Sequence, residues 1–176
     1  MRGENLSESN LPEFKDKLNI EPDIIINLQG DMPNITPEII SDLVSYMSKN
    51  KCDIGTLASK FSSKSEIRNP NVVKVAVKDK LSENMFLNAL DFFRIDQNSV
   101  DNLYHHVGIY AFTSKALMRY VNLKRSKLEL ERNLEQMRAM DNGEKIYALE
   151  SCGKFHLGVD TEADLQEARR LAKLIG

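Results

Sequence analysis

The chain has 176 residues, of which 41% are hydrophobic and 28% charged, and its net charge is -2. This balance is typical of one globular domain with a substantial core and excludes fibrous and disordered proteins. The near-neutral charge argues against nucleic acid or an anionic membrane surface as a partner. No apolar run approaches the roughly 20 residues that span a bilayer, and the first ten residues lack the apolar segment of a signal peptide, so we expect a cytoplasmic protein.

The first predicted elements are typical of an α/β fold. Residues 23–28, DIIINL, form a continuous β-branched run and predict a central strand that is covered on both faces. The sequence ITPEIISDLVSYMSKN predicts a helix, with Thr36 as its N-cap and Pro37 at its first position. Residues 53–59, DIGTLAS, predict the returning parallel strand, because a helix of this length supplies the crossover.

Further along the chain, the valines of residues 72–77 predict a strand with an exposed edge, and MFLNALDFFR predicts a second strand that forms a hairpin with it. Residues 104–113 predict a strand that returns to the core. Residues 114–121 and 128–140 predict helices, the second of which ends at Asn142 and Gly143. KIYALE predicts a further strand, and the C-terminal segment predicts a helix with Ala168 and Ala172 on its core face.

The motif Gln29-Gly30-Asp31 directly follows the first predicted strand. In open α/β sheets, ligands bind beyond the carboxyl ends of the strands, so these side chains are expected at the mouth of a crevice. Gly30 lets a backbone or a phosphate approach closely, and the carboxylate of Asp31 is a natural ligand for a hard cation such as Mg²⁺. The alternative is that Asp31 only caps a turn.

A second candidate site lies in HHVGIYAF, residues 105–112. Alternation along a strand places His106, Gly108 and Tyr110 on one face, opposite a core face of Val107, Ile109 and Ala111. The small Gly108 leaves a gap, so that the imidazole and the phenol can hydrogen-bond to one polyhydroxylated or carboxylated ligand. The alternative is that both side chains are structural.

Two further segments carry weaker candidates. Glu135 and Gln136 flank the apolar stripe of the predicted helix 128–140, so either can border a pocket, although Glu135 can instead pair with Arg138. Asp160 precedes the C-terminal helix, where N-capping alone explains it. If Asp160 lay beside Asp31, the two carboxylates would form a site for Mg²⁺.

The order of the motifs NLQGDMP, NPNVVKV, HHVGIYAF, LEQMRAMDNGEKI and GVDTEADL resembles that of the 3-deoxy-manno-octulosonate cytidylyltransferases, the CMP-KDO synthetases, from about Ile24 onward. The resemblance implies an α/β, Rossmann-like, three-layer nucleotide-sugar transferase fold with a dimerising β-hairpin subdomain. It also implies transfer of CMP from CTP to the sugar acid KDO, with release of pyrophosphate, for lipopolysaccharide biosynthesis. Residues 1–20 would be an irregular remnant of the nucleotide site, 21–69 and 104–176 the α/β core, and 70–103 the dimerisation arm of a homodimer.

The resemblance implies roles for individual residues as well. Asp31 and Asp160 match the two Mg²⁺-binding aspartates on which catalysis depends. The residues that match the KDO site are Gln29, His106, Tyr110, Glu135 and Gln136, and Arg94 matches an arginine near the sugar carboxylate. The implied step is attack by the anomeric hydroxyl of KDO on the α-phosphorus of CTP, in which protein groups position the reactants and offset negative charge.

The sequence also departs from the family pattern. It has no counterpart of the basic loop IPARxxSxRLPGKPL, which holds the triphosphate, and GENLSESNLPEF is only a blurred remnant of the SGTxR segment. We therefore expect an N-terminally truncated fold with weak CTP binding and little activity. The alternatives are a non-catalytic dimerising remnant, one half of a split enzyme with a separate N-terminal half, and a cytidylyltransferase for another sugar acid such as sialic acid.

Overall fold

The computed structural model describes residues 21–33, 35–82, 85–95, 101–151, 158–159 and 162–175. The irregular lead-in predicted for residues 1–20 and the predicted metal ligand Asp160 therefore lie outside the described residues.

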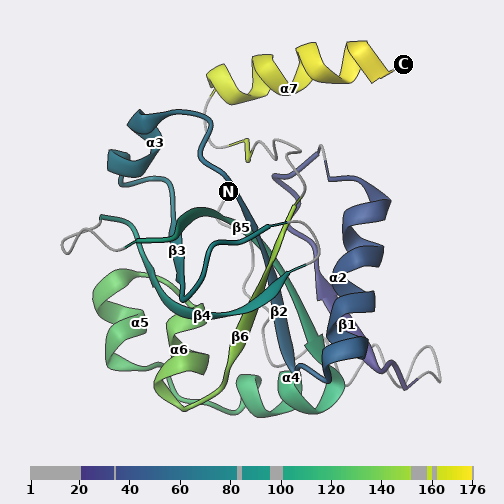
Figure 1. The fold of residues 1–176 in the computed structure, drawn as a ribbon, viewed down its shortest axis with the longest axis vertical. Coiled ribbons are helices and arrows are strands. Elements are labelled where there is room, and N and C mark those ends of the chain that lie inside the picture. The colour runs from purple at the N-terminus through teal and green to yellow at the C-terminus, as the bar shows by residue number, and fades with distance from the viewer. Residues whose placement is uncertain are drawn as a thin grey trace.

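The described strands form one six-stranded mixed sheet (Figure 1). Their order across the sheet is β1 (Ile24–Asn27), β5 (Leu103–Thr113), β2 (Ile54–Ser59), β6 (Ile146–Glu150), β4 (Phe86–Phe93) and β3 (Lys74–Val77). Strands β2 and β6 are parallel, and the other neighbouring pairs are antiparallel. Because β3 also pairs with β5, the pairings close into a ring that leaves β1 outside it.

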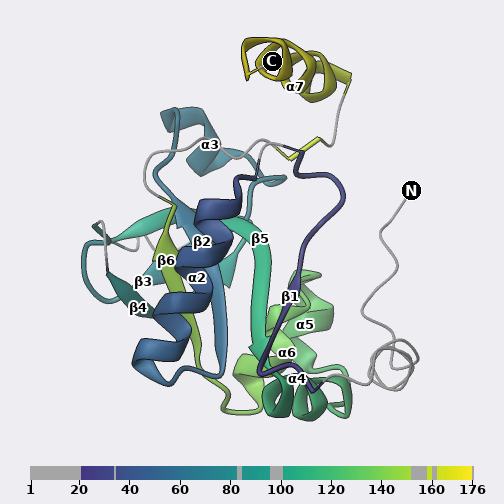
Figure 2. The ribbon, with the colours of Figure 1, turned by 90° about the vertical axis from the view of Figure 1, so that its right-hand side faces the viewer.

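Helices cover both faces of this sheet (Figure 2), which confirms the predicted α/β three-layer fold. Helix α2 (Pro37–Asn50) packs on one face through Ile39, Leu43 and Met47. The other face is covered by α4 (Ser114–Val121), α5 (Lys127–Arg132) and α6 (Gln136–Asp141). Two more helices, α3 (Lys64–Arg68) and α7 (Glu162–Ile175), lie toward one end of the molecule (Figure 1).

The alternation of β5 separates the two layers of the core. Val107, Ile109 and Ala111 are buried against α2, as predicted. Phe112 points the other way, into the core beneath α4 and α6. At Gly55 in β2 the sheet and α2 approach closely, because an added Cβ would lie 2.9 Å from Met47 Sδ. A larger residue at this position would therefore crowd the buried side chains of Met47 and Leu43.

The prediction that β1 is a central strand is wrong for the described sheet. Its side chains are only half-buried, and β5 is the one strand with which it pairs among the described residues. The strands β1 and β2 do run in the same direction, since both are antiparallel to β5, but β5 lies between them. The continuous apolar run thus predicted correctly that these residues form a strand, but it did not predict the position of that strand in the sheet. The position depends on pairing with β5, which comes from a distant part of the chain.

The prediction that residues 72–77 form a strand with an exposed edge is also wrong. All residues of β3 are buried, and the strand pairs with both β4 and β5. The ammonium of Lys74 is enclosed and donates to the carbonyl oxygens of Asn69 and Val72 at 2.6 and 2.9 Å. Because β4 pairs with β6, the hairpin continues the core sheet, and its role as a dimerisation arm stays a prediction.

The predicted helix 128–140 is two helices, α5 and α6. The chain breaks at Asn133, whose φ of 53° is left-handed, so the apolar stripe does not continue. Leu130 is consequently 58% exposed, whereas Leu134 and Met137 are buried. Helix α6 ends at Asn142 and Gly143, as predicted, with Gly143 at a φ of 82°.

The predicted C-terminal helix is present as α7 and stands apart from the sheet in both views (Figures 1 and 2). Ala168 is buried, but Ala172 is exposed, so the predicted core face is only partly covered. In the part of the chain that the structure describes, no helix is long and apolar enough to cross a membrane.

Candidate functional site

A cavity of about 530 Å³ opens between the end of β1, the face of β5 that carries His106 and Tyr110, and the junction of α5 and α6. All of the predicted site residues that the structure describes line it: Gln29, Asp31, Arg94, His106, Tyr110, Glu135 and Gln136. These residues come from segments that are far apart in the sequence. The fold therefore brings the predicted set to one place, although its binding roles stay predictions.

The turn after β1 forms one wall of the cavity. The N–H of Met32 donates to the carbonyl oxygen of Gln29 at 3.3 Å, and this turn leaves the Asp31 side chain exposed at the cavity. The Val159 N–H donates to the carbonyl oxygen of Asp31 at 2.9 Å. Val159, which directly precedes Asp160 in the sequence, therefore contacts the backbone of Asp31.

A row of aromatic rings forms the floor. The ring of His106 lies edge-on to Phe92 at 5.0 Å between centroids and 5.4 Å from Tyr110, which is 6.0 Å from Phe112. Between them, Gly108 leaves the predicted gap: a Cβ added there would approach only Met32 Cε, at 3.4 Å. The rings are tilted against one another, and their polar atoms are the imidazole nitrogens of His106 and the hydroxyl of Tyr110.

Burial controls the ionisation of this floor. It lowers the pKa of His106 to about 3, with a smaller contribution from His105, so the imidazole is neutral at physiological pH. Burial, followed by Tyr120 and Glu135, raises the pKa of Tyr110 well above its usual range. The Tyr110 hydroxyl is buried and makes no hydrogen bond of normal geometry with the described residues, although the nearby Thr56 hydroxyl slightly offsets the rise in its pKa. A buried hydroxyl in this state is available for a ligand.

The break between α5 and α6 forms the opposite wall. It places Gln136, which is 9% exposed, at the start of α6, and the Tyr120 hydroxyl donates to the carbonyl oxygen of Glu135 at 3.1 Å. The alternative weighed for Glu135, an ion pair with Arg138, is not the one that the structure has. Arg138 donates to both carboxylate oxygens of Glu129, at 2.8 and 2.7 Å, and so joins the two helices.

The final wall is the end of β4. Arg94 lines the cavity, and its guanidinium donates to the carbonyl oxygens of Pro70 and Asn71 at 3.3 and 3.4 Å. Its own carbonyl oxygen accepts from the Lys74 ammonium at 2.5 Å. The buried lysine therefore fixes the backbone from which this arginine reaches the cavity.

Thr56 was missed by the sequence analysis. It is fully buried in β2, and its hydroxyl oxygen lies 3.0 Å from His106 Nε2. The sequence did contain one indication, since Thr56 is a polar residue within the largely apolar strand IGTLAS. A hydroxyl that is buried in such a strand requires a hydrogen-bond partner.

The predicted Mg²⁺ site at the β1 turn stays a prediction, because Asp31 is its one described carboxylate. Among the described residues no group of three or more His, Cys, Asp or Glu side chains is positioned to hold a metal. Asp31 alone offers an exposed carboxylate at the turn, next to the segment that leads into Asp160. Carboxylate oxygens are the ligands that Mg²⁺ prefers.

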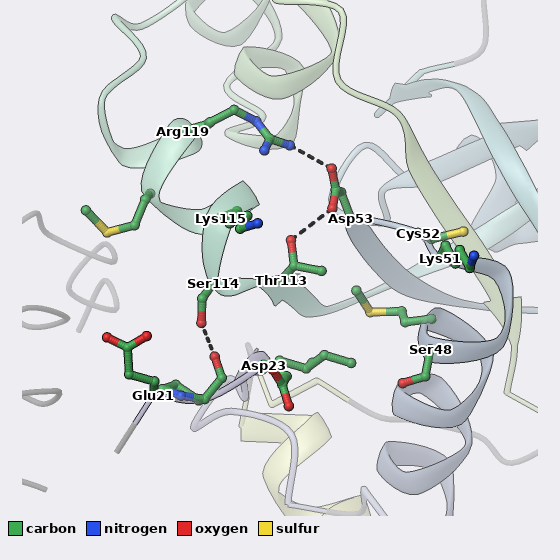
Figure 3. A pocket seen from close by; sticks show the side chains of 14 residues that line it. Glu21, Asp23, Ser48, Lys51, Cys52, Asp53, Thr113, Ser114, Lys115 and Arg119 are labelled. Atoms are coloured by element: carbon green, nitrogen blue, oxygen red, sulfur yellow. Dashed lines mark hydrogen bonds and ion pairs between the residues drawn. The ribbon is translucent and has the colours of Figure 1, made fainter. Parts of the chain in front are cut away.

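A second pocket, of about 750 Å³, lies between the start of β1, the end of α2 and the start of α4, and contains none of the predicted site residues (Figure 3). Two of its charged lining residues, Arg119 and Asp53, form an ion pair. Arg119 contacts Asp53 at 2.8 Å and Glu144 at 2.6 Å, and the Thr113 hydroxyl donates to Asp53 at 3.0 Å. These contacts join α4 to the start of β2 and to the chain before β6.

Comparisons with known proteins agree with the motifs. Residues 5–146 match the family model described as Cytidylyltransferase. The 3-deoxy-manno-octulosonate cytidylyltransferase of Nitrobacter hamburgensis is 45% identical over 148 residues, which are 84% of this chain and 56% of that protein. The enzyme of the same name from Rhizobium meliloti is 43% identical, over 86% of this chain and 60% of its own length. The chain thus spans somewhat more than half of these relatives.

Solved structures agree as well. The structure of CMP:2-keto-3-deoxy-manno-octonic acid synthetase complexed with CTP has a TM-score of 0.77 and 34% identity, covering 93% of this chain and 66% of that one. An apo UDP-glucose pyrophosphorylase has a TM-score of 0.61 at 14% identity and shares the fold alone. On the family match and these likenesses, the chain belongs to the cytidylyltransferase family.

Proposed function

We propose that this chain carries the sugar-acid site of a CMP-KDO synthetase, which transfers CMP from CTP to KDO and releases pyrophosphate for lipopolysaccharide biosynthesis. The observation that carries the proposal is the convergence of Gln29, Arg94, His106, Tyr110, Glu135 and Gln136 on one cavity. The relatives named 3-deoxy-manno-octulosonate cytidylyltransferase support the choice of sugar acid. Sialic acid is the alternative substrate, and a cytoplasmic homodimer is part of the proposal.

The polar atoms of the cavity suit a hydroxylated acid. The unpartnered Tyr110 hydroxyl and the amides of Gln29 and Gln136 donate to or accept from sugar hydroxyls. The neutral His106 adds another hydrogen-bonding atom without a charge. Arg94 is the lining side chain that can neutralise a carboxylate.

In the proposed reaction, Asp31 and Asp160 would hold Mg²⁺. The ion would offset the charge of the phosphates and lower the pKa of the attacking sugar hydroxyl. The residues of this chain bind and orient KDO, so that its anomeric hydroxyl faces the α-phosphorus of CTP. The aromatic floor excludes water from one side of the sugar.

The sequence carries no counterpart of the family's basic phosphate loop, so we expect the 176 residues by themselves to bind CTP weakly and to turn over slowly. Each missing charge-assisted contact is worth about 1.5–3 kcal/mol. The second candidate function is non-catalytic binding of the sugar acid by a dimer of this chain.

The direct test is calorimetric binding of KDO, with Tyr110→Phe compared with Tyr147→Phe, a tyrosine of β6 outside the cavity. We expect the Tyr110 variant to weaken binding about tenfold, because it removes one hydrogen bond of about 1.4 kcal/mol. Equal affinities in the two variants, or no KDO binding by the unchanged chain, would refute the proposal. Pyrophosphate release from CTP, KDO and Mg²⁺, with Asp31→Ala and Asp160→Ala as controls, then measures the activity that the chain has by itself.

A further inference from the structure

Thr56 makes a set of contacts that determines the state of His106. The side chain is fully buried in β2, on the face of the sheet that looks toward the cavity floor. Its hydroxyl oxygen lies 2.7 Å from the carbonyl oxygen of Ile109, 3.3 Å from that of Val107 and 3.0 Å from His106 Nε2.

The strand pairing explains why the hydroxyl is needed here. The register between β2 and β5 jumps, so that Thr56 pairs with Tyr110 while Leu57 pairs with Val107. Gly108 and Ile109 are thereby left out of this ladder, as in a bulge. The Ile109 carbonyl oxygen instead accepts a hydrogen bond from the Thr56 hydroxyl.

A hydroxyl has one proton, and that proton is already committed. Two oxygens at 2.7 Å require a proton between them, and a carbonyl cannot supply it, so Thr56 donates to Ile109. The Thr56 oxygen can then only accept from His106, which means that Nε2 carries the imidazole proton. Nδ1 is left with a lone pair, and none of the described residues hydrogen-bonds to it.

We propose that Thr56 is a positioning residue that holds His106 as the Nε2–H tautomer, so that Nδ1 accepts a hydrogen bond from a hydroxyl of the bound sugar acid. The proposal rests on the proposed function and assigns the kind of ligand group that this part of the cavity takes. A carboxylate at Nδ1 would face a lone pair and is rejected, since neither atom has a proton to share. The sugar acid is therefore oriented with a hydroxyl at His106 and its carboxylate elsewhere.

Two neighbours hold the ring in this orientation. Phe92 is edge-on to it at 5.0 Å, and Tyr110 lies at 5.4 Å, so the imidazole cannot turn over without disturbing the aromatic floor. The low pKa of His106, caused first by burial, keeps the second proton off Nδ1 across the physiological range.

The test reads the tautomer directly, by long-range ¹H–¹⁵N correlation spectra of the full chain labelled at its three histidines. His106→Gln identifies the signal. We expect the Nε2–H pattern in the unchanged chain and in Thr56→Ser, which keeps the hydroxyl. Thr56→Val keeps the shape without the hydroxyl, so we expect a mixed or Nδ1–H pattern and at least tenfold weaker KDO binding.

An Nδ1–H pattern in the unchanged chain, or an unaltered Nε2–H pattern in Thr56→Val, would overturn the proposal. If the valine variant does not fold, the spectra of the unchanged chain and of Thr56→Ser still decide the tautomer. An Nε2–H pattern that depends on Thr56, in a chain that does not bind KDO, would support the Thr56 assignment and refute the proposed function. The two failures are therefore distinguishable.

Discussion

The ion pair between Glu129 and Arg138 offers the sharpest test of how the cavity wall is held. Glu129 is 1% exposed, and its carboxylate accepts two hydrogen bonds from Arg138 and one, at 2.9 Å, from Arg125. Glu129→Gln keeps the shape but leaves one oxygen in place of two and turns an amide donor toward a guanidinium. We expect the free energy of unfolding to fall by about 3 kcal/mol, because breaking one side of a buried pair leaves the other charge uncompensated.

The assay is urea denaturation, with thermal unfolding as a second measure, where we expect a decrease of about 6–12 °C. The matched control is Glu131→Gln on the same helix. Glu131 is exposed and lies 3.5 Å from the exposed Lys127, so its loss should cost less than about 0.5 kcal/mol. A loss below about 1 kcal/mol in Glu129→Gln, similar to the control, would refute the reasoning.

The pH dependence gives an independent check of the same pair. Burial alone would raise the pKa of Glu129, but the hydrogen bonds from Arg138 and Arg125 outweigh it, and the pKa lies below its ordinary value of 4.5. The folded state therefore binds this proton less readily than the unfolded state. The contribution of the ionised Glu129 to the free energy of unfolding is complete above pH 4.5 and is lost as the pH falls through the pKa of Glu129 in the folded state. The stability difference between the unchanged chain and Glu129→Gln should shrink accordingly in acid.

Three further predictions follow from the same contacts. Folding lowers the pKa of His106 from 6.5 to about 3, so the unfolded state binds this proton more readily than the folded state. The free energy of unfolding should therefore fall as the pH drops from 6.5 toward 3, by up to about 1.4 kcal/mol per pH unit. Urea titrations at several pH values should show a smaller pH slope in His106→Gln than in the unchanged chain. Lys74→Met should cost about 3 kcal/mol by leaving enclosed carbonyl oxygens unpaired, whereas the exposed Lys78→Met should cost less than about 0.5 kcal/mol in the same assay. Gly55→Ala should cost about 1–3 kcal/mol in urea unfolding, because its Cβ would crowd Met47; an unchanged midpoint would show that α2 yields freely.

Local patterns predicted the elements of this fold better than their neighbours. The alternation in β5 correctly separated the core face from the cavity face, since each side chain direction follows from the strand itself. The positions of β1 and β3 in the sheet were predicted wrongly, because pairing with β5 depends on residues far away in the sequence. The break at Asn133 was missed as well, since periodicity does not reveal a single left-handed residue.

The candidate site shows the same division. The side chains that line its cavity were predicted from motifs and the family resemblance, and their roles stay predictions. Thr56 was not predicted, because its contacts arise from a register jump between β2 and β5. Likewise, the pairing of Arg138 with Glu129 rather than Glu135 depends on how α5 turns into α6. Residues that act through others are positioned by tertiary geometry, and a single sequence gives them little signal.

The charges around the cavity separate sugar binding from nucleotide binding. Arg94 is the only permanently cationic side chain among the described residues that line it, and His106 is neutral. A triphosphate with several negative charges would find little compensation there, whereas a sugar acid with one carboxylate would be matched. Two lost charge-assisted contacts of about 1.5–3 kcal/mol each weaken CTP binding by about 10²–10⁴-fold. Adding a polypeptide that contains the family's basic loop should therefore strengthen CTP binding and leave KDO affinity nearly unchanged.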